Sequence, residues 1–160
     1  MVVIVMGVTG AGKTTVGSLL ASQMKWEFAD ADSFHSPESK AKMHQGIPLT
    51  DLDRAPWLQA MRDAITQWIA QNKSVVLACS ALKRAYRDEL YAGPEVKFVY
   101  LRGTQELISS RLEHRHGHFA GESILASQFD ALEEPKDAIA VNISATPEAI
   151  VSEIRNRLGV

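Results

Sequence analysis

Short runs of apolar residues recur along the chain, separated by longer segments of mixed polarity. The runs cover residues 2–6, 74–79, 96–101 and 138–143. Continuous apolar runs of this length are typical of strands that are buried on both faces of a parallel sheet. A shorter extended piece at residues 26–29 is expected to add a fifth strand. The pattern therefore predicts an α/β protein built on a central sheet of five parallel strands.

The segments between the strands show apolar residues at helical spacing. Helices are predicted over residues 13–24, 56–71, 83–91, 105–113, 122–132 and 147–158. Two helix starts carry clear signals. Pro147 stands at a first helical position after the candidate N-cap Thr146, and Thr104 offers a side-chain oxygen suited to capping. Helical crossovers between parallel strands bring the loops at the strands' carboxyl ends to one rim, where we expect the functional site.

Composition narrows the class of protein. The chain has 160 residues, of which 46% are hydrophobic, enough for one buried core and too few to make two large domains. A formal net charge of −2 disfavours a protein dedicated to nucleic acids or anionic membranes. The lone Cys79 excludes an internal disulfide, and neither a signal peptide nor an apolar membrane span is recognisable. We expect one cytoplasmic domain, residues 1–160, that acts on small molecules and has no nucleic-acid or membrane partner.

Two segments interrupt the alternation of strands and helices. Residues 35–53 are polar and contain Gly46 and Pro48, so we expect a substrate-binding insertion near residues 35–55. The second segment places Arg111 and Arg115 four residues apart before a stretch rich in glycine and histidine. It predicts a hinged lid near residues 111–125.

The loop after the first strand has the spacing of a P-loop, G-x-x-x-x-G-K-[ST]. The phosphate-binding residues that this motif predicts are Gly7, Val8, Thr9, Gly10, Ala11, Gly12, Lys13, Thr14 and Thr15. Glycines allow successive backbone N–H groups to point at phosphate oxygens, lysine supplies a mobile cation, and the Thr14 hydroxyl can ligate Mg²⁺. A plain glycine-rich turn, the alternative interpretation, requires neither the lysine nor the threonine.

Two aspartates could supply the carboxylates that phosphoryl transfer needs in addition to a P-loop. The strand at residues 74–79 lacks the terminal aspartate that often helps to hold magnesium, so another carboxylate is needed. Asp30 and Asp32 lie two residues apart, and in an extended segment beside the P-loop strand they would point the same way. We assign Asp30 to the magnesium site and Asp32 to a substrate hydroxyl, as positioning group or general base. The alternative is a pair of solvated turn aspartates.

Five cations are candidates for binding anionic groups. Arg111 and Arg115 are expected to close over the nucleotide and to stabilise charge in the transition state; a solvated helix face is the alternative. Arg54, Lys83 and Arg87 lie in or beside predicted rim loops and could bind a substrate carboxylate. Arg87 could instead form an ordinary surface ion pair.

Taken in order along the chain, these residues resemble the small P-loop gluconokinases, which are relatives of shikimate kinase. Motifs in the first half that carry the resemblance are the P-loop with Thr15, Asp30-Ala31-Asp32, Phe34-His35, Lys42-Met43, Gly46, Pro48, Leu49, Asp51, Asp53, Arg54, Pro56, Trp57 and Leu58. Motifs in the second half are Cys79-Ser80-Ala81-Leu82-Lys83, Tyr86-Arg87-Asp88, Tyr100-Leu101, Arg111-Leu112, Arg115, His118-Phe119, Ser127-Gln128-Phe129 and Leu132-Glu133-Glu134-Pro135. The chain departs from the family pattern at Ala31, where glycine is frequent, and at Ser36, which separates His35 from a proline.

The resemblance implies a three-layer P-loop kinase fold of the nucleoside-monophosphate-kinase type. It also implies ATP and Mg²⁺ as cofactors and D-gluconate as the substrate, phosphorylated at its terminal hydroxyl to 6-phosphogluconate. Among the residues that match the family, Asp32, His35, Arg54, Lys83 and Arg87 would bind gluconate. A homodimer is compatible with the resemblance.

Two rival functions remain open from the sequence. A shikimate kinase or nucleoside monophosphate kinase would share the P-loop mechanics and differ in its acceptor. A nucleotide-dependent regulatory module would bind or hydrolyse the nucleotide without transferring phosphate.

Overall fold

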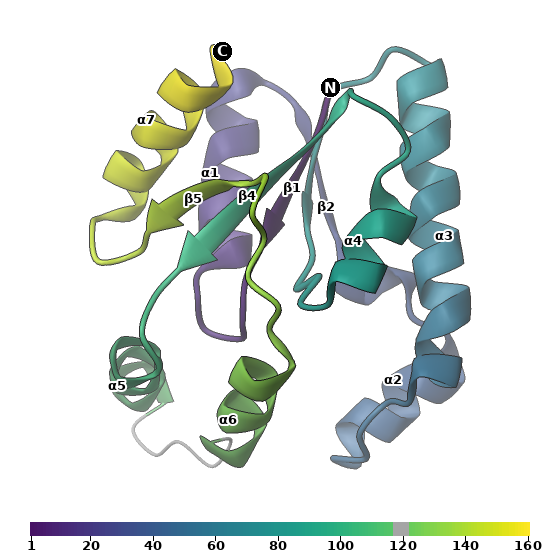
Figure 1. Ribbon diagram of the computed structural model, residues 1–160, viewed down its shortest axis with the longest axis vertical. Coiled ribbons are helices and arrows are strands. Elements are labelled where there is room, and N and C mark those ends of the chain that lie inside the picture. The colour runs from purple at the N-terminus through teal and green to yellow at the C-terminus, as the bar shows by residue number, and fades with distance from the viewer. Residues whose placement is uncertain (117–121) are drawn as a thin grey trace.

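The computed structural model describes residues 1–116 and 122–160, and the side chains of residues 114–116, 122 and 123 lie outside that description. A parallel sheet of five strands forms its centre, in the order β2-β3-β1-β4-β5 (Figure 1). The strands are β1 (Val2–Met6), β2 (Glu27–Asp30), β3 (Val75–Ala78), β4 (Val96–Arg102) and β5 (Ile139–Asn142). The predicted five-stranded parallel sheet is confirmed.

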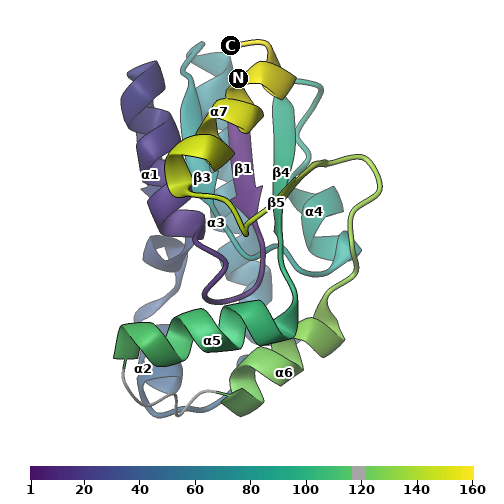
Figure 2. The ribbon, with the colours of Figure 1, turned by 90° about the vertical axis from the view of Figure 1, so that its left-hand side faces the viewer.

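Helices cover both faces of the sheet and one of its ends. They are α1 (Lys13–Met24), the 3₁₀ helix η1 (Ala31–Phe34), α2 (Pro37–His44), α3 (Asp51–Ala70), α4 (Arg84–Leu90), α5 (Gln105–His116), α6 (Glu122–Ala131) and α7 (Pro147–Leu158). Helices α1 and α7 lie on one face, and α3 and α4 lie on the other (Figure 1). Figure 2 shows α5 and α6 beyond the carboxyl ends of the strands, below the P-loop in that view. The structure is therefore a three-layer α/β/α arrangement with additional helices at the rim predicted to carry the site.

The central strand explains why the sheet is buried on both faces. All five residues of β1 are inaccessible to solvent. Val3 and Val5 belong to the apolar cluster shared with α1 and α7, while Ile4 and Met6 belong to the cluster shared with α3. Since alternate residues of a strand face opposite sides, a strand covered by helices twice must be apolar throughout. The uninterrupted apolar run is a direct consequence of the three layers.

Both predicted caps are confirmed. The Thr146 hydroxyl accepts a hydrogen bond from the Ala149 N–H at 3.2 Å, and the Thr104 hydroxyl accepts one from the Leu107 N–H at 3.1 Å. Each interaction satisfies one of the backbone donors that the first turn of a helix leaves without an intrahelical partner.

Helix α3 begins earlier than predicted. Its first residue is Asp51, and Pro56 lies inside the helix rather than at its start. Thr50 and Asp53 form a capping box, in which the Thr50 hydroxyl accepts from the Asp53 N–H at 3.1 Å and the Asp53 carboxylate accepts from the Thr50 N–H at 2.9 Å. This reciprocal pair sets the start of the helix. Pro56 offers no N–H to the carbonyl of Leu52, and Leu52 is 84% exposed, so water can satisfy that carbonyl.

The polar segment after β2 contains helices that the sequence pattern did not predict. η1 follows β2 directly, and α2 begins after Ser36, whose hydroxyl accepts from the Ser39 N–H at 3.1 Å. Both helices are short, and most of α2 is exposed, so neither leaves a clear apolar stripe in the sequence. Among the residues that the structure describes, no helix combines the length and apolar character needed to cross a membrane.

Candidate active site

The P-loop joins β1 to α1 with a backbone that only glycine adopts readily. Gly10 and Gly12 have φ values of 78° and 97°. A Cβ atom on Gly10 would also lie 2.9 Å from the Leu112 side chain of α5, so conformation and space both demand glycine there. Helix α1 starts without a side-chain cap in the described structure and without an acidic residue in its first turn. Its amino terminus therefore presents free N–H groups and a positive dipole end to an anion.

Lys13 and Thr14 follow the loop on the first turn of α1. The Lys13 ammonium donates to the Val8 carbonyl at 2.9 Å, which folds its side chain back over the loop. Desolvation lowers the pKa of Lys13, and Cys79, Asp32 and Asp30 oppose that shift. The two aspartates therefore lie near enough to act on the P-loop lysine electrostatically.

Asp30 joins the P-loop across the intervening strand. The Thr14 hydroxyl donates to Asp30 Oδ2 at 3.2 Å. The expectation that β2 lies beside the P-loop strand is wrong, because β3 separates them: Asp30 pairs with Ala78, which pairs with Val5 on its other side.

Asp32 is placed by a turn rather than by an extended strand. Asp30 Oδ1 accepts a hydrogen bond from the Asp32 N–H at 3.0 Å, and Asp32 lies in η1. The expectation that both carboxylates point the same way in an extended segment is therefore wrong in its geometry. Asp30 is the N-cap of η1, a role typical of aspartate, and this capping bond fixes Asp32 two residues later. Asp32 is exposed at the rim.

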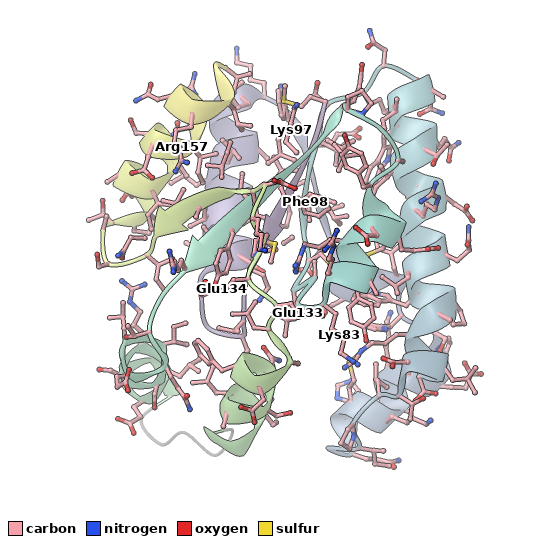
Figure 3. The ribbon with its side chains drawn as sticks, viewed as in Figure 1. Lys83, Lys97, Phe98, Glu133, Glu134 and Arg157 are labelled. Atoms are coloured by element: carbon pink, nitrogen blue, oxygen red, sulfur yellow. The ribbon has the colours of Figure 1, made fainter. Side chains whose placement is uncertain are left out.

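A polar cluster lies at the amino-terminal end of α3. Arg54 donates to the Tyr86 hydroxyl at 3.2 Å, and that hydroxyl donates to Asp51 Oδ1 at 2.6 Å. The Lys83 ammonium lies 3.5 Å from the same carboxylate oxygen. Figure 3 shows Lys83 at the start of α4, on the side of α3. The structure thus brings the predicted Arg54 and Lys83 together. No functional role had been predicted for Tyr86 and Asp51, although both belong to the motifs that carry the resemblance.

Arg87 points away from this cluster. Its guanidinium donates to the backbone carbonyls of Ala81, Leu82 and Glu133 at 2.8, 3.0 and 2.6 Å. The side chain is buried, and burial lowers the pKa of Arg87. These bonds tie the loop before α4 to the segment after α6. The geometry therefore gives no support to the predicted substrate contact of Arg87.

His35 is buried at the end of η1. Its ring stacks on the indole of Trp57, with centroids 4.5 Å apart, and burial lowers the pKa of His35. Its Nδ1 atom has no hydrogen-bond partner among the described residues. The Trp57 indole N–H donates to the Ala31 carbonyl at 2.8 Å. His35 and Trp57 together connect α3 to the turn that carries Asp32.

A cavity of about 290 Å³ lies beside the P-loop. It is lined by Gly10, Ala11, Gly12, Thr15, Val16, Arg111, Leu112, Ala145, Pro147 and Ile150. Arg111 enters this lining from α5 and donates to the Ile143 carbonyl. The lining residues at the start of α7 were not predicted, because nothing in the local sequence places that segment beside the P-loop. The Arg115 side chain lies outside the described residues, as do residues 117–121 of the predicted lid.

Helix α6 also reaches the P-loop. The Gln128 side-chain oxygen accepts a hydrogen bond from the Thr9 N–H at 2.6 Å. A larger cavity, of about 780 Å³, is lined by residues of α4, of β4 and of the segment after α6. Figure 3 labels three of these residues, Phe98, Glu133 and Glu134. None of its lining residues belongs to the P-loop or to the acidic turn. The candidate site is therefore the rim formed by the P-loop, η1 and the start of α3.

Known proteins resemble this chain in sequence and in fold. The shikimate kinase family model matches residues 9–158. A probable gluconokinase from Xenopus tropicalis is 44% identical, over 99% of this chain and 93% of the relative. The crystal structure of a gluconokinase from Sinorhizobium meliloti 1021 superposes with a TM-score of 0.89 at 40% identity, covering 98% of this chain and 90% of that one.

A more distant structure shows the shared fold alone. The APS kinase CysC of Mycobacterium tuberculosis, in complex with AMPPNP and APS, superposes with a TM-score of 0.70 at 14% identity. The predicted P-loop kinase fold is confirmed by these superpositions. With relatives of this similarity matched over nearly its whole length, the chain belongs to the gluconokinase family of P-loop kinases.

Proposed function

We propose that the protein transfers the γ-phosphoryl group of ATP to the terminal hydroxyl of D-gluconate and so forms 6-phosphogluconate. The observation that carries the proposal is the 3.2 Å contact between the P-loop Thr14 and Asp30, which joins the phosphate-binding loop to the acidic turn. It brings a site for phosphates next to carboxylates that can receive a hydroxyl group. The gluconokinase relatives support the choice of acceptor.

The P-loop would hold the phosphates of ATP. Its backbone N–H groups and the uncapped start of α1 bind phosphate oxygens, and Lys13 neutralises part of their charge. The adenosine portion would occupy the cavity beside the P-loop, between Arg111 and Pro147. The guanidinium of Arg111, with Arg115, would add cationic charge near the transferring group once the segment predicted as a lid covers the nucleotide.

The donor set beside the P-loop fits magnesium. Mg²⁺ prefers oxygen ligands, and a threonine hydroxyl lies next to a carboxylate here. Thr14 would hold the ion directly, and Asp30 would hold it directly or through water. A bound Mg²⁺ would neutralise charge on the β- and γ-phosphate oxygens.

Asp32 would orient the acceptor and take its proton. The terminal hydroxyl oxygen of gluconate forms a bond to the γ-phosphorus, the bond from that phosphorus to the bridging oxygen breaks, and ADP leaves. The hydroxyl proton passes to the Asp32 carboxylate. The capping bond between Asp30 and the Asp32 N–H fixes the turn. One backbone segment therefore positions both Asp32, which would bind the acceptor, and Asp30, which would bind the metal.

The carboxylate of gluconate would bind at the polar cluster formed by Arg54 and Lys83. Both cations lie beside Tyr86 and have no backbone carbonyl as a partner in the described structure. Cations that face a polar rim are available to an anionic ligand, unlike Arg87, whose donors are used inside the protein. The presence of one buried, free cysteine, Cys79, leads us to place the reaction in the reducing cytoplasm.

The proposal is tested by incubating the purified protein with ATP, Mg²⁺ and D-gluconate and detecting 6-phosphogluconate by mass spectrometry. Shikimate and the nucleoside monophosphates serve as competing acceptors, with ADP release measured for each. We expect gluconate to give the highest kcat/KM. Faster phosphorylation of shikimate or of a nucleotide would overturn the assignment of the acceptor. ATP hydrolysis that no acceptor changes would favour a regulatory module.

A further inference from the structure

Tyr86 holds together the cluster that faces the acceptor. Its hydroxyl is the only group there that both accepts and donates, since arginine and lysine can only donate and an ionised aspartate can only accept. Arg54 donates to the Tyr86 hydroxyl at 3.2 Å. The proton of that hydroxyl is therefore directed at Asp51 Oδ1, 2.6 Å away. The tyrosine therefore has one hydrogen-bond orientation, aimed at a carboxylate.

The ring of Tyr86 also lies close to two cations. The Arg54 guanidinium carbon lies 5.8 Å from the ring centroid, and the Lys83 ammonium lies 5.6 Å from it. Cations are attracted to the negative face of an aromatic ring at such distances. One side chain thus gathers an O–H donor and two positive groups, a combination that suits a carboxylate.

The carboxylate now in that site is Asp51. Its Oδ1 atom is the partner of both Tyr86 and Lys83. The hydrogen bond from Tyr86, followed by the charge of Lys83, lowers the pKa of Asp51. The capping of α3 does not depend on this side chain, because Thr50 and Asp53 provide it. With a side chain 73% exposed, the ion pair contributes little stability, and its replacement by another carboxylate costs little.

We propose that Tyr86 and Asp51 determine the preference for an acidic acceptor: the Tyr86 hydroxyl, with Lys83 and Arg54, binds the acceptor's carboxylate, and Asp51 is the internal carboxylate that it displaces. This inference rests on the proposed gluconate kinase activity. It adds two residues to the acceptor site and gives them opposite effects. Tyr86 strengthens binding of the acid, and Asp51 competes with it.

The test compares two substitutions in the full-length protein. Tyr86→Phe removes the hydroxyl and keeps the ring, so the KM for gluconate should rise about tenfold, as expected for a lost hydrogen bond to a charged group. Asp51→Asn removes the competing charge, so the KM for gluconate should fall about threefold, within the range of an exposed ion pair. For both variants, kcat and the KM for ATP should stay within about twofold of the wild type, because neither residue belongs to the P-loop or lines the cavity beside it.

Matched controls are available on the same helices. Tyr91 is the C-cap residue that follows α4 and is 50% exposed, and Asp63 lies exposed on α3. Tyr91→Phe and Asp63→Asn should leave the KM for gluconate unchanged. Thermal unfolding of all four variants, followed by circular dichroism, separates a local effect from a loss of folding.

Several outcomes would overturn the inference. An increased KM for gluconate in Asp51→Asn would make Asp51 a ligand of the acceptor rather than its competitor. A fall in kcat or a rise in the KM for ATP in Tyr86→Phe would assign the tyrosine a structural role. Failure of the wild-type protein to phosphorylate gluconate would instead overturn the proposed function itself, so the two failures are distinguishable.

Discussion

The imidazole of His35 lies flat against the indole of Trp57, with ring centroids 4.5 Å apart and planes 9° from parallel. Trp57 comes from α3, and His35 ends η1, which carries Asp32. The same indole donates its N–H to the Ala31 carbonyl at 2.8 Å in a buried position. A rigid helix therefore holds the turn that presents the proposed acceptor-orienting carboxylate.

We predict that Trp57→Phe lowers kcat more than it affects the binding of ATP. The variant retains an aromatic ring but leaves the buried Ala31 carbonyl without its donor, a change worth roughly 1–3 kcal/mol of stability. We expect kcat to fall about tenfold, since small displacements of a positioning group reduce the rate strongly, while the KM for ATP changes less than about twofold. Trp68→Phe, on the same helix and away from η1, is the control. Equal losses of kcat in the two variants would contradict a positioning role.

The burial of His35 predicts a pH dependence of stability. Because its pKa in the folded protein is lowered by desolvation, the unfolded chain binds the proton more readily. The stability conferred by neutral His35 is complete above its unfolded pKa of about 6.5 and is lost as the pH falls below that value. Thermal unfolding between pH 7.5 and 5.5 should therefore show a steeper decline for the wild type than for His35→Phe, which keeps the stacking. Parallel declines would show that another group controls this range.

Much of the fold could be predicted from local patterns. Residues buried between two helical layers must be apolar, so the central strands appear as uninterrupted runs, and Thr146 with Pro147 marks the exact start of α7. The order of the strands could not be predicted, because it depends on which way each crossover turns. Pro56 suggested the wrong start for α3, since proline is over-represented at the first position of helices. The capping box at Thr50 starts this helix five residues earlier than predicted.

Part of the candidate site could likewise be predicted from local sequence, and part could not. The P-loop is local, and its spacing alone marks it. The contact between Tyr86 and Asp51 joins residues 35 positions apart, and no periodicity encodes such a pair. The role of Arg87 could not be predicted either, because an arginine near the rim can face a ligand or the protein interior. Its three backbone partners, at Ala81, Leu82 and Glu133, are recognisable only in the folded structure.

Asp30 should govern the response to magnesium. Removing a carboxylate that assists a metal site typically weakens metal affinity about 10–100-fold. We expect Asp30→Asn to raise the Mg²⁺ concentration required for half-maximal activity by at least about tenfold, as measured by titrating Mg²⁺ at saturating ATP and gluconate. Asp63→Asn, an exposed carboxylate on α3, should leave the titration unchanged. An unchanged titration in Asp30→Asn would remove this residue from the proposed metal site.

Arg87 should prove important for stability rather than for substrate binding. Arg87→Met retains the apolar stem but leaves three backbone carbonyls without their donor, which should lower the free energy of unfolding by roughly 2–4 kcal/mol in urea. Arg84→Met, at a side chain 80% exposed, should change it by less than about 0.5 kcal/mol. Under conditions in which the Arg87 variant is folded, its KM for gluconate should match that of the wild type. A higher KM with unchanged stability would restore the original prediction of a substrate contact.

Asp32→Asn separates acceptor chemistry from nucleotide binding. Asparagine occupies nearly the same volume and leaves the capping bond between the Asp32 backbone N–H and Asp30 available, so the turn should persist. It cannot accept the proton of the attacking hydroxyl, and loss of a general base typically costs about 10²–10⁴-fold in rate. We therefore expect kcat for gluconate to fall within this range, while the affinity for ATP, measured by calorimetry, changes by less than about twofold. Near-normal turnover would show that the hydroxyl proton leaves by another route, and weakened ATP binding would place Asp32 in the nucleotide site.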